Sequence, residues 1–281
     1  MHSTTAVPDT DPAAHYDRVT DAWRLLPGHE LHYGVFDRGD EPLPVATRAL
    51  TERMIAAARF RPGQKVLDVG CGTGEPARHL VTTQGVRVLG ITTSAVGVRQ
   101  ATEAAAAAGL SDRASFELRD GTDNGLPDAS FDRVWVLESS HLMPARDRLI
   151  AECARVLRPG GRLVLCDIIR RRGIPFAEVR ARRTDFAVLR AVYGEARMDA
   201  LDAYTGLAAA NGLDVDLVED LTAATLPTFD AWRANAAKHR TEVRALLGAD
   251  ELAQFERSVD ILEAFWRDGT LGYGLVAASR S

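Results

Sequence analysis

The residues with the clearest chemical content lie in the stretch Lys65–Gly74, which reads KVLDVGCGTG. Its apolar residues are typical of a strand buried on both faces, and its glycines let the backbone turn tightly and approach a ligand closely. A dinucleotide fingerprint has the spacing G-x-G-x-x-G, but Glu75 takes the place of the last glycine here. A carboxylate there repels a diphosphate, whereas Asp68 at the strand's end suits an ammonium group. The stretch therefore indicates a nucleoside ligand that is not a dinucleotide.

This loop resembles motif I of the class I S-adenosylmethionine-dependent methyltransferases, and further motifs follow in that family's order over residues 60 to 170. The resemblance implies S-adenosyl-L-methionine as the cofactor. It places Asp68, Gly70 and Gly72 near the methionine end of that cofactor. It also implies that Asp120, with Gly121 after it, accepts a hydrogen bond from the adenine amino group at the end of the third strand.

The ribose ligand departs from the family's pattern. The family usually ends its second strand with an acid that binds both ribose hydroxyls, but this chain has Thr92-Thr93-Ser94 there. A hydroxyl can make one of those bonds, although it lacks the bidentate reach of a carboxylate. We therefore assign Thr92 to the ribose, with Gln100 as a second candidate. Related enzymes often carry a glutamine where Gly97 stands in this chain.

His141 is the predicted general base. It lies in the stretch Glu138–Pro144, which reads ESSHLMP and resembles the E-S-x-H-x-M-P segment of sugar and natural-product O-methyltransferases. Those relatives often carry a second histidine where Leu142 stands here. Asp167 matches the acid that orients the histidine in such relatives. Alternatively, His141 only binds the substrate or caps a loop, and Asp167 is a helix cap or turn former.

These residues need a parallel sheet that brings strand ends together at one edge. The apolar runs predict an α/β fold, with a Rossmann-like, mostly parallel seven-stranded sheet and helices on both faces. The expected strands cover residues 65–69, 86–91, 115–120, 131–137, 157–167, 212–219 and 271–278, with a turn at R-P-G-G in the fifth. Helices are expected over residues 176–193, 198–210, 228–247 and 250–268.

We divide the chain into three regions. Residues 1–58 form an N-terminal tail and helical lid, residues 59–170 form the S-adenosylmethionine-binding core, and residues 171–281 complete the sheet with an inserted helical substrate cap around the sixth strand. Leu31-His32-Tyr33-Gly34 resembles the short contact segment of small-molecule methyltransferases. The resemblance makes Tyr16, His32 and Tyr33 candidates for substrate binding, and a tyrosine ring can face a sulfonium favourably. Packing alone is the alternative. Glu138 is expected to support the cofactor loop.

Composition narrows the class of protein further. The 281 residues carry 34 Lys plus Arg against 39 Asp plus Glu, and a net charge of -5 gives no general attraction to nucleic acid. The run Arg170-Arg171-Arg172 reads as a solvated loop. No apolar stretch approaches membrane-spanning length and no signal segment is visible, so we expect a cytoplasmic protein without a membrane partner. The three cysteines show no zinc or disulfide spacing, and we expect no metal.

The sequence therefore predicts a methyltransferase that acts on a bacterial secondary-metabolite small molecule, at a hydroxyl or an amine. In-line displacement from a sulfonium needs alignment, exclusion of water and removal of a proton, and histidine suits the last task near neutral pH. Two alternatives stay open: a cyclase that keeps the fold and cofactor without transferring a methyl group, and a non-catalytic binding module. The sequence leaves the oligomeric state open, with a homodimer among the possibilities.

Overall fold

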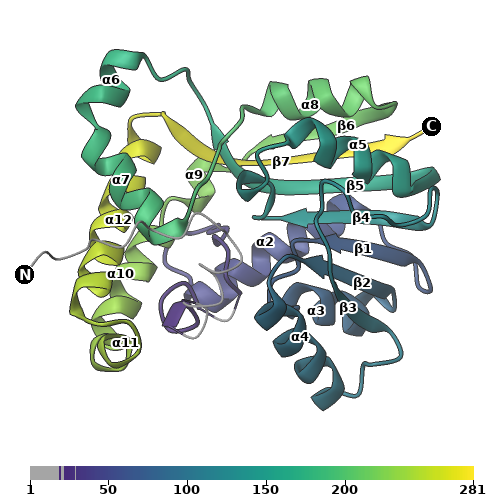
Figure 1. Cartoon of the computed structure of the whole chain (residues 1–281), viewed down its shortest axis with the longest axis horizontal. Coiled ribbons are helices and arrows are strands. Elements are labelled where there is room, and N and C mark those ends of the chain that lie inside the picture. The colour runs from purple at the N-terminus through teal and green to yellow at the C-terminus, as the bar shows by residue number, and fades with distance from the viewer. Residues whose placement is uncertain (1–18, 20–21, 29) are drawn as a thin grey trace, which may run out of the picture.

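A computed structural model describes residue 19, residues 22–28 and residues 30–281, and within them seven strands form one sheet in the order β3-β2-β1-β4-β5-β7-β6 (Figure 1). The first five strands run parallel, and β7 is antiparallel to both β5 and β6. This confirms the predicted α/β fold with a mostly parallel sheet. The strands are β1 Lys65–Val69, β2 Arg87–Thr92, β3 Ala114–Leu118, β4 Phe131–Leu137, β5 Leu157–Arg170, β6 Leu213–Asp220 and β7 Leu271–Arg280.

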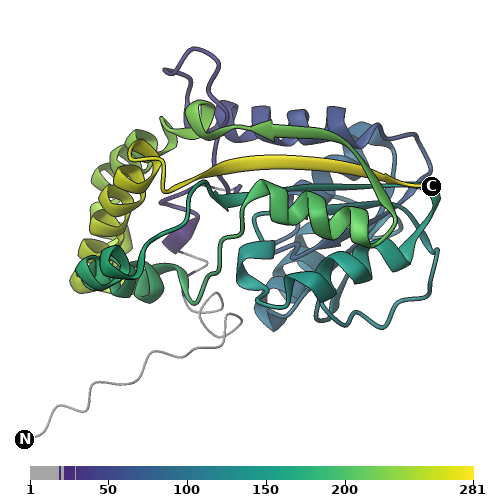
Figure 2. The same ribbon diagram turned by 90° about the horizontal axis from the view of Figure 1, so that it is seen from above.

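Helices cover both faces of the sheet. Successive side chains of a strand point to opposite faces, so each buried strand contributes apolar side chains to two cores, one on each face. On one face, α2 Leu43–Ala58, α3 Glu75–Gln84 and α4 Ala95–Ala107 pack over a core that includes Val66 and Trp135. On the other face, α5 Arg146–Val156 and α8 Leu201–Ala210 pack over a core that includes Leu67 and Val134. Figure 2 shows α2 on one side of the sheet and α5 and α8 on the other.

The fifth strand includes the stretch that was expected to form a turn, and it ends later than expected. The predicted R-P-G-G turn lies inside β5, and the pairing register with β4 shifts between Phe131 and Arg133 beside it. Gly160 takes a positive φ of 73°, a conformation that glycine adopts without strain. An irregularity therefore replaces a separate turn, and β5 runs on to Arg170 at the carboxyl edge of the sheet.

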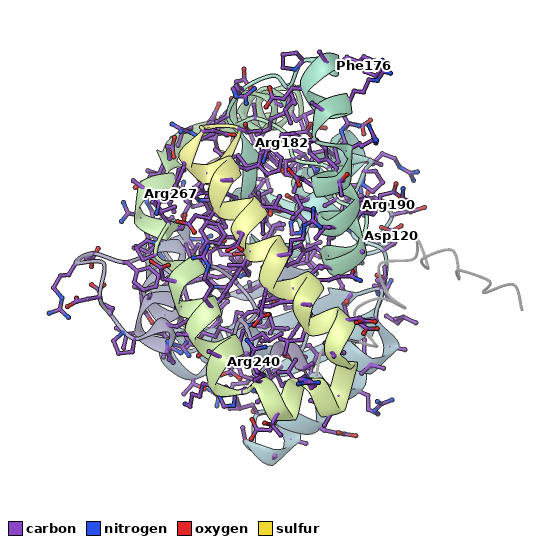
Figure 3. All side chains as sticks on the ribbon, turned by 90° about the vertical axis from the view of Figure 1, so that its left-hand side faces the viewer. Asp120, Phe176, Arg182, Arg190, Arg240 and Arg267 are labelled. Carbon is purple, nitrogen blue, oxygen red and sulfur yellow. The ribbon has the colours of Figure 1, made fainter. Side chains whose placement is uncertain are left out.

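A helical cap lies beyond one end of the sheet (Figure 1). The cap consists of α6 Phe176–Ala181 and α7 Arg183–Tyr193 before β6, then α9 Thr222–Thr225, α10 Thr228–Lys238, α11 Arg240–Leu247 and α12 Ala249–Arg267 between β6 and β7. Figure 3 shows α12 crossing the outer face, with Arg267 at its end and Arg190 on α7. The expected helices over 176–193 and 228–247 are each broken once, at Arg182 and at His239.

Candidate active site

A cavity of about 810 Å³ lies between the cap and the carboxyl ends of the parallel strands. This is where open α/β sheets bind their ligands, at the point where the strand order reverses. The structure brings ten of the predicted site residues to its wall: His32, Tyr33, Asp68, Gly70, Gly72, Thr92, Asp120, Gly121, Glu138 and His141. Asp167 lies behind His141 and does not line the cavity. Tyr16 lies outside the described residues.

The loop after β1 takes the shape that its glycines allow. Gly70 and Gly72 have φ of 78° and 51°, in the left-handed region that favours glycine. A Cβ on Gly70 would stand 2.2 Å from the Cβ of Ser139, whereas a Cβ on Gly72 would meet nothing within 4 Å. Gly70 is therefore required by the neighbouring loop after β4, and Gly72 leaves open space on the cavity wall.

Asp68 is a buried carboxylate without a partner. Its side chain comes from β1, the residue is 3% exposed, and its Oδ2 has no hydrogen-bond partner among residues 19, 22–28 and 30–281. Burial alone raises the pKa of Asp68 to about 7. A buried carboxylate normally pairs with a cation, so this orphan at the cavity wall fits the ammonium group of S-adenosylmethionine.

Asp120 and Thr92, farther along the cavity wall, are held by local hydrogen bonds. Asp120 Oδ1 accepts hydrogen bonds of 2.8 Å from both the backbone nitrogen and the hydroxyl of Thr122, which fixes the carboxylate and leaves Oδ2 for a ligand. Thr92 Oγ1 accepts a bond of 3.2 Å from the nitrogen of Ser94. Gln100 is not brought to the cavity: its Oε1 accepts a hydrogen bond of 3.2 Å from Arg24 instead.

His141 and Asp167 form a buried pair. A 3₁₀ helix, Ser140–Leu142, follows β4 and turns the imidazole so that Nδ1 lies 2.6 Å from Asp167 Oδ1. Asp167 also accepts bonds from the nitrogens of His141 (3.0 Å) and Ile168 (2.7 Å), and from the hydroxyl of Ser140. Tyr204 Oη lies 2.8 Å from that hydroxyl. Because Nδ1 faces Asp167 and His141 lines the cavity, Nε2 is the nitrogen left for a ligand.

The pair is also coupled electrostatically. Burial opposes protonation of His141, but the carboxylate of Asp167 outweighs it and raises the pKa of the imidazole above its ordinary value. Burial likewise opposes ionisation of Asp167, but His141 prevails and lowers the pKa of that carboxyl. The arrangement holds the imidazole in one orientation and stabilises its charged form, as an acid behind a general base does.

Glu138 lines the cavity and also holds a distant segment of the chain in place. Its backbone takes a φ of 44°, and its Oε1 accepts a bond of 2.7 Å from the nitrogen of Tyr33 and a short bond from the hydroxyl of Tyr273. Burial raises the pKa of Glu138 to about 7. It therefore holds the segment before α2 against the sheet. Tyr273 carries no signal in the sequence that would have placed it here, because it is a strand residue distant along the chain.

His32 and Tyr33, the two lid candidates that the structure describes, line the cavity and are themselves buried. The ring of Tyr33 stacks on Trp266 with 5.1 Å between centroids, and its hydroxyl has no hydrogen-bond partner. His32 Nδ1 lies 2.8 Å from the carbonyl oxygen of Tyr33, and its Nε2 lies 3.4 Å from Glu30. Burial opposes protonation of His32, but Glu30 prevails and raises the pKa of the imidazole. His32 is therefore fixed within an ion pair.

The remaining wall is mostly apolar and comes partly from the cap. A buried apolar residue of a helix looks the same in the sequence whether it faces a cavity or another helix, so most of these residues carry no signal. The cap helices contribute Phe186, Leu189, Tyr193, Trp232 and Leu262. Other parts of the chain contribute Trp23, Leu31, Leu142, Ile168, Ile174, Met198 and Leu271.

Two features are absent from the part of the chain that the structure describes. It contains no group of three or more His, Cys, Asp or Glu side chains placed to hold a metal ion. It also contains no helix with the length and apolar character needed to cross a membrane.

The strand order, the glycine loop and the orphan carboxylate together define a class I S-adenosylmethionine-dependent methyltransferase fold. The family described as mycolic acid cyclopropane synthetase matches residues 4–272, and the chain belongs to this family. It is 37% identical over 265 residues to 27-O-demethylrifamycin SV methyltransferase of Amycolatopsis mediterranei (strain S699). The matched region covers 94% of this chain and 95% of that relative.

Solved structures show the same architecture. Mycolic acid cyclopropane synthase CmaA1, complexed with SAH and CTAB, superposes with a TM-score of 0.84 at 22% identity over 95% of this chain and 96% of its own. The [4+2]-cyclase SpnF superposes with a TM-score of 0.82 at 26% identity over 98% of this chain and 99% of its own. The chain is thus an S-adenosylmethionine-dependent methyltransferase by family and by fold.

Proposed function

We propose that this protein methylates a hydroxyl group of a small-molecule bacterial secondary metabolite, with an amine as the second type of acceptor. The observation that carries the proposal is the His141–Asp167 pair, 2.6 Å apart at the cavity wall. An alcohol needs a base for proton removal far more than an amine does, because its unperturbed pKa is far above neutrality. The relative that shares 37% identity is named for methylation of an oxygen, in a demethylrifamycin.

The cofactor, when bound, supplies a methyl group on a sulfonium that is already an activated leaving group. Asp68 would hold the ammonium group, Gly70 and Gly72 would face the methionine end, and Asp120 and Thr92 would face adenosine. Gly121 lines the same wall, and a Cβ there would stand 2.6 Å from Val69 Cγ1 and 3.2 Å from Met143 Sδ, so a side chain does not fit at this position. These assignments rest on the orphan oxygen of Asp68 and on the positions of the others around one cavity.

His141 then performs the acid–base step. Its Nε2 would accept the proton of the substrate hydroxyl as the methyl group moves from the sulfur of the cofactor to that oxygen, and Asp167 would stabilise the imidazolium that results. The cap excludes water from the cavity, which strengthens these interactions. On the substrate side, His32 and Tyr33 lie at the floor of the cavity and shape it.

Transfer of a labelled methyl group tests this proposal. Purified protein would be incubated with methyl-labelled cofactor and a panel of hydroxylated natural products, and label in the organic phase would be measured. We expect transfer with the wild type and a loss of about 100-fold to 10,000-fold in kcat for His141→Asn. Calorimetry with S-adenosylhomocysteine is the control, because the variant should bind it like the wild type. Unchanged turnover in His141→Asn would remove the general base from the proposal.

A cyclase is the second candidate, favoured by the superposition on SpnF along almost the whole chain. The same incubation separates the two functions. A cyclase would consume its substrate and leave the label on the cofactor, whereas a methyltransferase would move the label to the product. A binding module is distinguished by His141→Asn, since it would keep its biological effect with the imidazole removed.

A further inference from the structure

The charged side chains that line the cavity are paired, with two exceptions. Within the described residues, each of the others has a hydrogen-bond or ion-pair partner: His32, Glu75, Arg119, Asp120, Glu138, His141, Arg190 and Glu195. Asp68 has none, and the proposed function assigns it the ammonium group of the cofactor. Arg170 is the second exception: its side chain makes no hydrogen bond or ion pair with any residue that the structure describes. An unpaired cation on a cavity wall favours an anionic ligand, just as the unpaired carboxylate favours a cationic one.

Arg170 is held in place by its backbone. It ends β5, pairs with Leu271 of β7, and donates its backbone N–H to the carbonyl of Asp199 at 3.0 Å. Side chains alternate along a strand, so Arg170 points to the same face as Ile168, which also lines the cavity. The guanidinium therefore belongs to a residue whose main chain is fixed by the sheet, and Arg170 is partly buried.

The neighbours of Arg170 in the sequence behave differently. Arg171 pairs with Asp220 at 3.1 Å, and Arg172 pairs with Glu178 at 2.6 Å. The expectation that residues 170–172 form a solvated loop is therefore wrong for Arg170, which lies within β5 and lines the cavity. Arg190, the other arginine on this side, is 50% exposed and pairs with Glu195 at 3.4 Å. Of the three arginines in the described part of the cavity wall, Arg119, Arg170 and Arg190, only Arg170 has a side chain without a hydrogen bond or ion pair.

We propose that Arg170 binds an anionic oxygen group of the methyl acceptor, such as a carboxylate or an ionised phenol. The proposal rests on the proposed function and adds a substrate class to it: a molecule with a bulky apolar body, an acidic group and a hydroxyl that reaches His141. The body would lie against the apolar side chains of the cap, and the guanidinium would make charge-assisted, paired hydrogen bonds to the acid. Arg170 is then a specificity residue rather than a catalytic residue.

A matched pair of fluorescent probes tests the proposal without any methyl transfer. The anionic probe is 8-anilino-1-naphthalenesulfonate, and the neutral probe is N-phenyl-1-naphthylamine, which has the same rings and no acid. Both would be titrated into protein saturated with S-adenosylhomocysteine, so that Asp68 is occupied. For Arg170→Met we expect Kd of the anionic probe to rise about 10-fold to 100-fold, with a change of less than about twofold for the neutral probe.

Two further variants serve as controls. Arg180→Met removes an exposed charge from α6, outside the cavity, and should leave both affinities unchanged. Arg170→Lys keeps the charge without the paired donors, so it should give an intermediate Kd for the anionic probe, and it provides the comparison if Arg170→Met does not fold.

Three results would overturn the proposal: equal effects on the two probes, no effect on either, or a weaker affinity for S-adenosylhomocysteine in the Arg170 variants. The last result would assign Arg170 to the carboxylate of the cofactor. Because all of these measurements are binding measurements, they are independent of the labelling experiment, whose failure would concern methyl transfer alone.

Discussion

Tyr33 and Glu138 are joined by a hydrogen bond of 2.7 Å from the backbone nitrogen of the tyrosine to the carboxylate of the glutamate. The same oxygen accepts a hydrogen bond from the hydroxyl of Tyr273 on β7. One buried side chain thus connects the segment before α2 with β4 and β7. Glu138 adopts a φ of 44°, and a conformation of this kind persists only where the surroundings hold it.

Replacing Glu138 with alanine should lower the free energy of unfolding by about 2–4 kcal/mol, because two buried donors lose their only acceptor. Urea denaturation at neutral pH would measure the loss. Glu138→Gln is the matched control, since it keeps an acceptor oxygen and removes only the charge. We expect it to retain most of the stability. Equal losses in both variants would contradict an account based on hydrogen bonding.

The pH dependence of turnover should report the pairing of His141 with Asp167. A general base acts only after losing its proton, and the pKa of His141 lies above its ordinary value. Turnover should therefore rise with pH through a pKa higher than that of a free histidine. In Asp167→Asn the carboxylate is gone, so this limb should move to lower pH while the maximum rate falls. Initial rates between about pH 5 and pH 9 measure both effects. A limb that stays in place would exclude His141 as the titrating group.

The sheet and its edge could be predicted from the sequence because they depend on short, local signals. Buried apolar runs define β1 and β4, and in a parallel sheet the residues after such runs meet at the same edge. Asp68, Asp120 and His141 each follow this rule, and all three line the cavity. The fold alone therefore predicts that these three residues lie around one cavity.

The cap and its contacts could not be predicted in the same way, because they depend on pairings between distant parts of the chain. Tyr273 contacts Glu138 across 135 positions, and no pattern near either residue indicates the bond. Gln100 is only a second candidate for the ribose, because relatives carry their glutamine at the position of Gly97, and the structure pairs Gln100 with Arg24. The charge run at 170–172 showed three similar residues, and only the strand pairing of β5 with β7 separates Arg170 from the other two.

Cofactor affinity should decrease as the pH falls below about 7. Burial raises the pKa of Asp68 to about 7, so the free protein carries a proton there at lower pH. Binding of an ammonium group needs the carboxylate, and each pH unit below the pKa should then cost about tenfold in Kd for S-adenosylhomocysteine. Calorimetry in two buffers of different ionisation enthalpy would detect the released proton. An affinity that stays constant from about pH 5 to pH 8 would contradict this role of Asp68.

Asp68→Asn should stabilise the protein without cofactor, and should do so only at higher pH. The pKa of Asp68 is raised from 3.8 to about 7 on folding, so its favourable contribution is complete below the unfolded pKa and is lost as the pH rises through the folded pKa. Asparagine cannot ionise and avoids that loss. Thermal unfolding should therefore show that the free energy of unfolding increases by about 1–4 kcal/mol at pH 8 and by much less at pH 5.

The matched control is Asp120→Asn, which changes an exposed carboxyl group in the same cavity and should not increase the free energy of unfolding. With saturating S-adenosylhomocysteine the wild type should be more stable than Asp68→Asn, because the wild type binds this ligand more tightly. A variant that is less stable than the wild type at pH 8 without ligand would show that the carboxylate of Asp68 has a partner in solution.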